Sequence, residues 1–422
     1  MRRRYFISQL MRTFLIIALF FCISTNRVYA ITLFNNDSIR ISIFTCGPGD
    51  DLYSKFGHTA IRVRNESVDD DIVFNYGMFN YNSENFIWRF ILGDTDYELG
   101  AEITTSFISR YKKEGIAMNE QVLNITNDEA KALLRSLMVN YMPMNRVYRY
   151  DFLYDNCTTR AKDIIETSFV DGTVVYDISS SDSLVTYREM LHDCLKDIPW
   201  IRLGIDCLLG AEVDRVPKKN KSIFLPGVLM NAIDNSYIKY KDGLCKKLIL
   251  SNNSIIKNKI KDNLNFDFSF NSFLHPVFVF TCLFLISVFL MTFELKKGVV
   301  FWIYDIFVML LLGLSGLIVS FLFFFSKHPA VDSNWLVIPL NPLYIVWIPF
   351  LIYNNMWEKR SVLHKVSLVV LTSFVILLPF IPQDINISVV LLVLTMIVRN
   401  ISNILVAGRI PNVYYEYNTK IS

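Results

Sequence analysis

The chain has 422 residues, of which 52% are hydrophobic and 14% aromatic, and its formal net charge at pH 7 is +3. This composition is too apolar for an ordinary soluble protein and indicates a membrane component. The net charge is small and no nucleic-acid-binding motif is visible, so we expect no nucleic-acid partner. Residues 31–270 mix polar and apolar side chains, whereas residues 273–407 hold long apolar runs.

The first 30 residues have the layout of a secretory signal peptide. Four arginines precede an uncharged apolar run at residues 14–23, and a small residue, Ala30, stands at the expected cleavage position. The alternative is a retained signal anchor, which the shortness of the apolar run disfavours. We therefore expect the chain from Ile31 onward to be exported.

Alternating apolar and polar residues predict three strands near the start of the exported part, at residues 40–46, 59–64 and 72–77. His58 stands directly before the second strand. A hairpin between the second and third strands would bring Asn75 near His58. An asparagine beside a catalytic histidine can accept its Nδ1–H and hold the tautomer. The alternative for Asn75 is an ordinary residue at a strand end.

A cysteine stands at a predicted helix start in FLYDNCTTRAKDIIE, residues 152–166. Asp155 and Asn156 are typical N-cap residues, so the helix is expected to begin at or beside Cys157. The positive end of the helix dipole favours a thiolate there. A thiolate nucleophile needs a base, and His58 is the best candidate, although papain-type enzymes have the opposite order of Cys and His. The alternative is that Cys157 is a small buried residue.

The rest of the exported part is predicted to complete an α+β domain. A capped helix is expected from about residue 127. The aromatic residues 85–93 are expected in the core, with an acyl-chain groove facing the membrane as the alternative. His192 is a second candidate base, but its predicted helix has no adjacent strand start, so we expect a surface or capping role. Residues 237–270 are rich in Lys and Asn and predict a linker.

The exported soluble part holds five cysteines, and this odd number leaves at least one thiol free unless it pairs between chains. A bond between Cys194 and Cys207 is conceivable, although both lie in helix-like segments. The pattern fixes no disulfide among Cys46, Cys194, Cys207 and Cys245.

Five apolar runs follow, each close to the ~20 residues that cross a hydrocarbon core. They lie at residues 273–293, 299–325, 335–353, 366–381 and 385–406. Lysines and arginines follow the first, third and fifth runs, whereas the outer loops hold only one lysine. By the positive-inside rule, the soluble domain faces outward and the C-terminus faces the cytoplasm.

Polar residues stand within and between these runs. Asp305 and Arg399 lie towards the inner side, and either they pair or the arginine snorkels. The outer loop at residues 326–335 is unusually polar for its length. It is either a turn with a tryptophan belt anchor or a contact, through His328 and Asn334, with a headgroup or substrate.

The exported chain resembles the Lnb-type lipoprotein N-acyltransferases of Bacteroides-like bacteria. The motifs that carry the resemblance are FGHTAIRV, IVFNYGMF, EQVLNIT, YDFLYDNCTTRAKDII, PWIRLGIDCLLG, FLPGVLM and SKHPAVDSNW. The two around His58 and Cys157 are the most specific. The soluble domain looks like a permuted papain-like fold related to NlpC/P60, as in the lecithin:retinol acyltransferase group, where His also precedes the Cys of an AsnCys motif.

The resemblance implies transfer of a fatty acyl chain from a phospholipid donor to the α-amine of a diacylglyceryl-cysteine lipoprotein, at the bacterial inner (cytoplasmic) membrane. It makes Cys157 the nucleophile of a two-step reaction and His58 the base. Asn75 is a less direct assignment, since related enzymes often use a second His. The chemistry requires no metal or cofactor. Four further residues are expected to contact substrate: Asn156, Arg160, His328 and Asn334.

Other functions use the same Cys–His pair. A phospholipase or lipid-remodelling hydrolase would pass the acyl group to water. A papain-like cell-wall peptidase would have no need of five spans. A non-enzymatic membrane sensor would need neither residue.

The predicted organisation is an α+β, permuted papain-like domain followed by an all-α bundle of about five transmembrane helices. We expect a signal peptide at residues 1–30, a periplasmic catalytic domain at 31–236, a linker at 237–270, a transmembrane domain at 271–408 and a cytoplasmic tail at 409–422.

Overall fold

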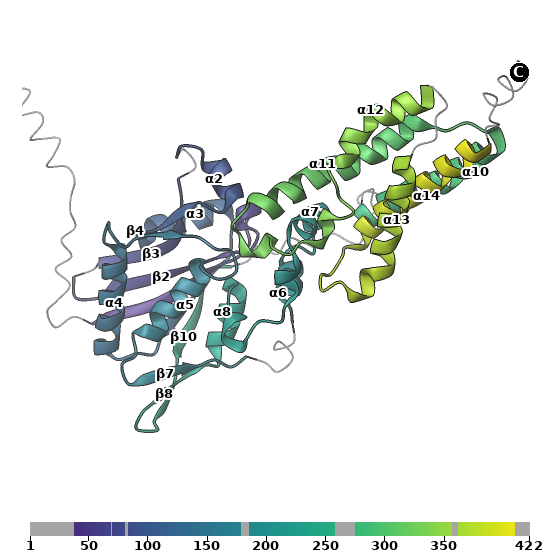
Figure 1. The fold of residues 1–422 in the computed structure, drawn as a ribbon. Helices are drawn as coiled ribbons and strands as arrows, with labels where there is room; N and C mark the ends of the chain where they lie inside the picture. Colours follow the sequence, from purple (N-terminus) through teal and green to yellow (C-terminus); the bar gives the residue numbers. More distant parts are fainter. Residues whose placement is uncertain are drawn as a thin grey trace, which may run out of the picture.

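The computed structural model describes residues 38–68, 70–80, 83–178, 185–257, 275–356 and 362–409. An α+β domain built on an antiparallel sheet is followed by a bundle of apolar helices (Figure 1). The predicted fold class is confirmed in these terms. The predicted signal peptide and almost all of the predicted cytoplasmic tail lie outside the described residues.

The main sheet has seven antiparallel strands in the order β10-β5-β1-β2-β3-β4-β6. A second sheet has the order β7-β8-β9. The three predicted strands are confirmed as β1, β2 and β3, and β2 pairs with β3 as expected. The strand bounds are β1 Ile39–Cys46, β2 His58–Asn65, β3 Asp70–Met78, β4 Asp96–Ile103, β5 Met118–Leu123, β6 Val147–Arg149, β7 Gly172–Val175, β8 Tyr237–Tyr240, β9 Cys245–Lys247 and β10 Ile249–Ile256.

Helices cover both faces of the main sheet. Because side chains alternate along a strand, Ile41 and Ile43 of β1 join the core under α4, α5 and α8, whereas Phe44 stacks on Phe107 of α3 with ring centroids 5.9 Å apart. The predicted helix near residue 127 is α4, whose N-cap Thr126 forms a capping box. The helix bounds are α2 Phe86–Leu92, α3 Thr104–Glu114, α4 Asn127–Tyr141, α5 Cys157–Thr167, α6 Tyr187–Cys194, α7 Pro199–Leu208 and α8 Pro226–Asp234.

The predicted linker at residues 237–270 is wrong for its first half. Residues 237–256 form β8, β9 and β10, and β10 is an edge strand of the main sheet beside β5. Most side chains of β10 are exposed, so the strand lacks the alternating apolar pattern by which strands are recognised. The α+β domain therefore extends to Ile256.

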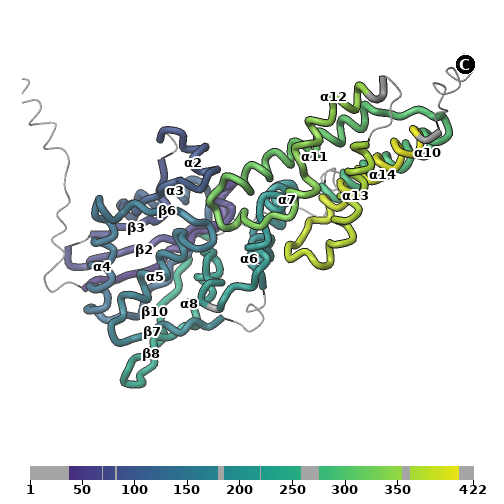
Figure 2. Tube along the Cα trace, viewed as in Figure 1, coloured from purple at the N-terminus to yellow at the C-terminus, as the bar shows by residue number. Residues whose placement is uncertain are grey.

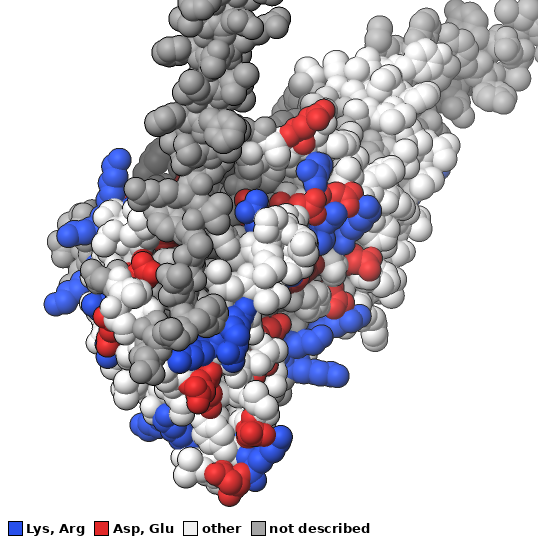
Figure 3. Space-filling view, turned by 90° about the vertical axis from the view of Figure 1, so that its left-hand side faces the viewer, with Lys and Arg blue, Asp and Glu red and all other residues white. Residues whose placement is uncertain are grey.

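Five apolar helices form the bundle. They are α10 Pro276–Lys297, α11 Trp302–Phe325, α12 Leu343–Met356, α13 Val362–Leu377 and α14 Ile387–Arg409. Within the described ranges, four apolar segments are long enough to cross a membrane, and the apolar part of α12 is shorter. The third predicted span began at residue 335, but α12 starts only at Leu343, whose N–H is capped by Asn341 at 3.0 Å. Figure 3 shows charged side chains of both signs on the end of the α+β domain, whereas the bundle behind it is mainly uncharged.

The bundle core holds a charge network. Arg399 of α14 is fully buried and donates to Glu294 of α10 at 2.7 and 2.8 Å and to Asp305 of α11. The pairing of Asp305 with Arg399 is thus confirmed, and the snorkelling alternative is wrong. Buried charges are tolerated when they are paired and hydrogen-bonded, so the network locks three spans together.

The two domains meet along a contact that we call the seam, formed by α2, α6 and α7 on one side and by the outer end of α11, residues 326–335 and the start of α14 on the other. Figure 2 shows α6 and α7 between the sheet and the bundle. Lys327 pairs with Asp94 at 2.9 Å, and the Asn334 amide donates to the carbonyl of Cys207 at 2.9 Å. At Gly210, a Cβ would lie 1.8 Å from a backbone oxygen of the bundle loop, so the approach requires glycine.

Two expectations about the α+β domain are wrong at the seam. Within residues 85–93, Phe86–Leu92 form α2, but the side chains of Ile87 and Trp88 are 70% and 54% exposed rather than in the core. His192 is not a surface residue: its Nε2 bonds to Asp206 at 2.6 Å and its Nδ1 accepts from Arg202 at 2.9 Å. Asp206 also binds the buried Arg188 and, through Asn386, the start of α14, so His192 belongs to a structural network.

Candidate active site

The main sheet brings together three residues that are far apart in the sequence. Cys157 is the first residue of α5, His58 is the first residue of β2, and Asn75 lies in β3. Helix α5 packs on β2 and β3, and the hydroxyls of Thr59 and Thr158 hydrogen-bond at 3.0 Å beside the cysteine. The predicted grouping of Cys157, His58 and Asn75 is therefore present in the structure.

The helix start is fixed by Asn156. Its Oδ1 accepts from the N–H groups of Thr158 and Thr159 at 2.8 and 3.0 Å, and its Nδ2 donates to the carbonyls of Phe152 and Phe224. Asn156 is 4% exposed, so this side chain positions the helix rather than reaching a substrate. The Asn156 side chain binds the N–H groups of Thr158 and Thr159 but not the N–H of Cys157. The N–H of Cys157 is therefore left as a donor in the first turn of the helix.

Arg160 is likewise held by its neighbours. Asp155, predicted as part of the cap, instead forms a two-bond pair with the Arg160 guanidinium at 2.5 and 2.7 Å. The guanidinium also lies over the Tyr148 ring, 3.6 Å from its centre. These contacts favour a positioning role for Arg160 over the expected substrate contact.

His58 is oriented by Asn75. The imidazole Nε2 hydrogen-bonds to Asn75 Oδ1, whereas the sequence argument assigned this bond to Nδ1. With Nε2 occupied, Nδ1 is the nitrogen that remains for the thiol of Cys157, its other hydrogen-bonding partner. Asn75 is 5% exposed, and its amide donates to the sulfur of Met78 at 3.2 Å, so the asparagine cannot turn freely.

The electrostatics favour a thiolate–imidazolium pair. Burial acts to raise the pKa of Cys157, but the charge of His58, its hydrogen bond and the N–H of Thr59 outweigh burial and bring that pKa below its usual value. Burial acts to lower the pKa of His58, but Cys157 and Asn75 raise it overall. Cys46, which lies opposite His58 on β1, differs from Cys157 in this respect. It is 1% exposed, and burial raises the pKa of its thiol.

A bulge in β3 opens space beside the cysteine. The pairing of β3 with β4 shifts register between Asn75 and Met78, and Gly77 within this stretch has φ of +89°. A Cβ on Gly77 would lie 3.8 Å from the Cβ of Cys157 and 4.0 Å from the hydroxyl of Tyr148. Neither Gly77 nor Tyr148 was predicted from the sequence. The NYG triplet after an alternating strand was the available signal for the bulge.

The loop residues His328 and Asn334 bond to groups at the seam rather than to Cys157 or His58. His328 Nε2 donates to the carbonyl of Phe90 in α2 at 2.8 Å. Asn334 is 2% exposed, and its side chain binds backbone groups of Cys207 and Leu336 and the Gln383 amide. This geometry favours a structural role for Asn334 and leaves His328 near α2.

An aromatic surface connects the end of the sheet that holds His58 with the apolar helices of the bundle. The ring centroids of neighbouring pairs along it are 5.2–6.4 Å apart, for example Phe79–Phe86 at 5.4 Å and Trp88–Phe321 at 5.2 Å. Phe79 follows Met78, the residue that contacts Asn75. We call this surface the apolar strip, and it consists of Tyr53, Phe79, Phe86, Ile87, Trp88, Phe90, Phe321 and Phe325.

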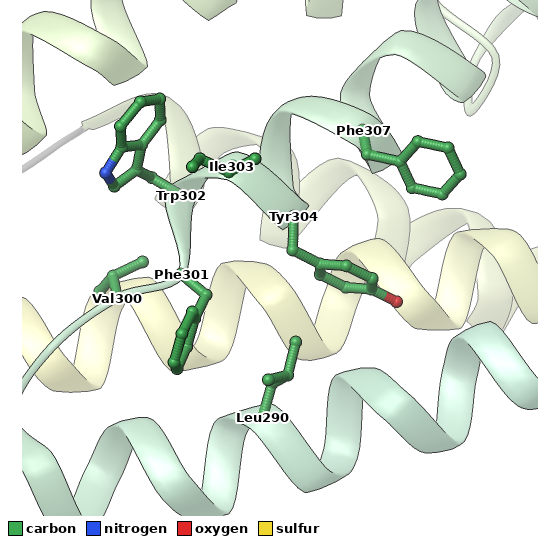
Figure 4. A pocket seen from close by; sticks show the side chains of 7 residues that line it. All are labelled: Leu290, Val300, Phe301, Trp302, Ile303, Tyr304 and Phe307. Atoms are coloured by element: carbon green, nitrogen blue, oxygen red, sulfur yellow. The ribbon is translucent and has the colours of Figure 1, made fainter.

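A pocket of about 440 Å³ lies elsewhere, at the beginning of α11 (Figure 4). Its lining is apolar and aromatic and includes Phe301, Trp302 and Tyr304. The α+β domain contacts the opposite end of α11, about 36 Å away along a 24-residue helix. The pocket is therefore no part of the cysteine site.

In the part of the chain that the structure describes, no group of three or more His, Cys, Asp or Glu side chains is placed to hold a metal ion. The described cysteines form no disulfide; they are Cys46, Cys157, Cys194, Cys207, Cys245 and Cys282.

Comparison with known families gives two matches. A family model described as the Lnb N-terminal periplasmic domain matches residues 29–192, and one described as the Lnb transmembrane domain matches residues 268–409. No curated protein and no solved structure matches the chain. The matches assign no catalytic residue, and the relation to papain-like folds stays a prediction.

Proposed function

The chain belongs to the Lnb family as a multi-pass membrane protein with a periplasmic N-terminal domain, and we propose that it is a thiol-dependent lipoprotein N-acyltransferase of the bacterial inner membrane. Its family name implies lipoprotein N-acylation. The observation that carries the proposal is the placement of Cys157 at a helix start, against a histidine that Asn75 orients. We propose a phospholipid as the acyl donor and a diacylglyceryl-cysteine lipoprotein as the acceptor.

The first half-reaction uses the thiolate of Cys157. It attacks an ester carbonyl of the phospholipid, and the carbonyl oxygen becomes an oxyanion beside the N–H of Cys157. Collapse breaks the ester bond, and the departing glycerol oxygen takes a proton from the His58 imidazolium. The products are a thioester on Cys157 and a lysophospholipid.

The second half-reaction passes the acyl group to the amine. The α-amine of the lipidated cysteine attacks the thioester carbonyl, and neutral His58 removes the proton that the amine loses. Collapse forms the amide and returns the thiolate, which is again paired with the imidazolium. Asn75 accepts the Nε2–H of the imidazole, so it holds the ring in one orientation in both charge states and favours the imidazolium.

The apolar strip supports a lipid donor. It runs from the neighbourhood of Asn75 over α2 to the outer end of α11, and Ile87 and Trp88 on it are largely exposed. Exposed apolar surface next to a membrane span is suited to acyl chains. A cell-wall peptidase, which acts on a polar substrate, has no use for such a surface.

His328 remains our proposal for an acceptor contact. His328 belongs to the loop at the periplasmic end of the bundle and lies against the apolar strip, with its ring 5.8 Å from that of Phe90. A lipid-anchored acceptor must place its amine at the thioester from this side. Asn334 is buried in the seam, so any effect of Asn334 on the acceptor is through the position of the loop.

The competing function that shares every one of these features is a phospholipid hydrolase, with water as the acceptor. The purified protein in phospholipid vesicles, supplied with a diacylglyceryl-cysteine peptide, distinguishes the two. The acyltransferase yields peptide carrying a third acyl chain in amide linkage. Production of free fatty acid at the same rate with and without peptide, and no amide, would establish the hydrolase instead.

A further inference from the structure

The cysteine site contains a buried hydroxyl that no described group satisfies. Tyr148 of β6 is 7% exposed, and its Oη has no hydrogen-bond partner among the described residues. A buried hydroxyl without a partner destabilises a protein, so its retention in a well-packed cluster calls for another explanation. The neighbouring Tyr76 shows the ordinary arrangement, because its hydroxyl accepts from Asn140 at 3.1 Å.

The Tyr148 hydroxyl points to the space beside the cysteine. One position, that of a Cβ on Gly77, is 4.0 Å from Tyr148 Oη and 3.8 Å from Cys157 Cβ. Since Gly77 has no side chain and its φ is +89°, the bulge keeps this position empty. A carbonyl carbon attacked by Cys157 would project its oxygen into a space of this kind.

The Tyr148 ring is held rigidly. Tyr148 pairs with Tyr97 across β6 and β4, the Arg160 guanidinium covers one face at 3.6 Å, and the Tyr76 ring stands edge-on at 6.3 Å. The Asp155 pair fixes Arg160 in turn. A donor held in place before the reaction costs no reorganisation when charge develops, which is the requirement for stabilising an oxyanion.

We propose that Tyr148 is a catalytic residue whose hydroxyl donates a hydrogen bond to the oxyanion formed when Cys157 attacks the phospholipid ester. It acts together with the N–H of Cys157. Burial, followed by the negative charge of Cys157, raises the pKa of Tyr148, so the phenol keeps its proton and remains a donor. The proton is shared with the oxyanion and is not transferred, so the ester bond still breaks with protonation by His58. This inference rests on the proposed function.

The test compares Tyr148→Phe with Tyr76→Phe. Each removes one hydroxyl and keeps the ring, so Arg160 retains its aromatic contact. The rate of acyl-enzyme formation is measured with phospholipid and no acceptor, and the melting temperature is measured in parallel. We expect Tyr148→Phe to lower the saturating rate by roughly 10²-fold with little change in KM, because one oxyanion donor is lost. Its melting temperature should be unchanged or higher, because no bond within the protein is lost.

The control should behave in the opposite way. Tyr76→Phe leaves the Asn140 amide without its acceptor, so it should lower the melting temperature and change the rate by less than about threefold. The inference is overturned if Tyr148→Phe reacts within about threefold of the wild-type rate, or if it loses rate and melting temperature together as a misfolded variant would. Absence of any acyl-enzyme in the wild-type protein would instead count against the proposed function itself.

Discussion

Beside Cys157, the Tyr148 hydroxyl remains open to an incoming molecule, whereas along the seam the side-chain polar groups hydrogen-bond within the protein. Cys157 and His58 bond to each other, and the Tyr148 hydroxyl beside them has no described partner. In the seam, the Asn334 side chain and the Gln383 amide bind backbone carbonyls, backbone N–H groups and each other. A polar residue near a membrane surface is therefore a site candidate only if its hydrogen-bonding capacity is left over.

The largest expected effects follow from substitutions at Cys157 and His58. Cys157→Ser and His58→Ala should each lower acyl transfer by roughly 10⁴-fold or more, because the nucleophile or its proton carrier is lost. Both variants should keep their melting temperature and membrane insertion, since neither side chain supports the core. Transfer assays on purified protein in vesicles measure the effect. Turnover near the wild-type level in either variant would remove that residue from the mechanism.

Asn75→Ala should have the next largest effect, lowering turnover about 10²-fold. The asparagine raises the pKa of His58, so its loss should lower that pKa. Activity needs the imidazolium to be present with the thiolate. It should fall at low pH as Cys157 gains a proton and at high pH as His58 loses one. The alkaline limb of the pH–rate profile should therefore move to lower pH in the variant. An unchanged limb would show that Asn75 does not set the charge state of His58.

A charge on the apolar strip should lower activity less than the substitutions beside Cys157 do. Ile87→Glu places a charge on the strip, and we expect a fall of about fivefold in transfer from bilayer phospholipid, as for a charge placed at the edge of the hydrocarbon region. The matched control is Val170→Glu, since Val170 is 83% exposed in the loop between α5 and β7. Figure 1 shows this loop on the part of the domain away from the bundle. A water-soluble short-chain ester should react equally well with both variants. Equal losses at both positions would mean that the strip does not meet lipid.

The smallest effects on turnover belong to the two loop residues. Asn334→Ala should lower the free energy of unfolding by about 2 kcal/mol, because buried seam groups lose their partners, while turnover per folded molecule is retained. His328→Ala loses only one solvent-exposed hydrogen bond, to the carbonyl of Phe90, so its free energy of unfolding should fall by less. Thioester formation should be kept, and more of the acyl chain should appear as free fatty acid. Denaturation curves and the ratio of amide to fatty acid separate the two. If the two variants changed the free energy of unfolding and the ratio of amide to fatty acid by the same amounts, the assignment of Asn334 to the seam and of His328 to the acceptor would be wrong.

The sequence predicted the grouping of Cys157, His58 and Asn75 better than it predicted the seam, for physical reasons. A cap at Asn156, a strand start at His58 and a hairpin are local patterns, and they lead to the arrangement of Cys157, His58 and Asn75. The nitrogen of His58 that contacts Asn75 depends on the ring orientation, which only the packing of α5 decides.

The remaining errors concern contacts between distant segments. The exposed edge strand β10 carries no apolar alternation, so it resembled a linker. The apolar residues of α2 resembled core, because an exposed apolar surface and a protein interior can have the same composition. The hydrogen-bond partners of His192 and Asn334 come from other segments of the seam, and no local sequence pattern indicates them. Tyr148 was missed because an absent partner is visible only after folding.

Peptide mass spectrometry shows whether Cys157 carries the acyl group between the two half-reactions. The protein is incubated with phospholipid alone, digested and analysed, and then chased with a diacylglyceryl-cysteine peptide. We predict one fatty acyl group on the peptide containing Cys157, released by hydroxylamine as a thioester and transferred to the amine of the acceptor during the chase. The peptide containing the buried Cys46 should stay unmodified. Amide product formed at the full rate with no acyl group on Cys157 would contradict the claim.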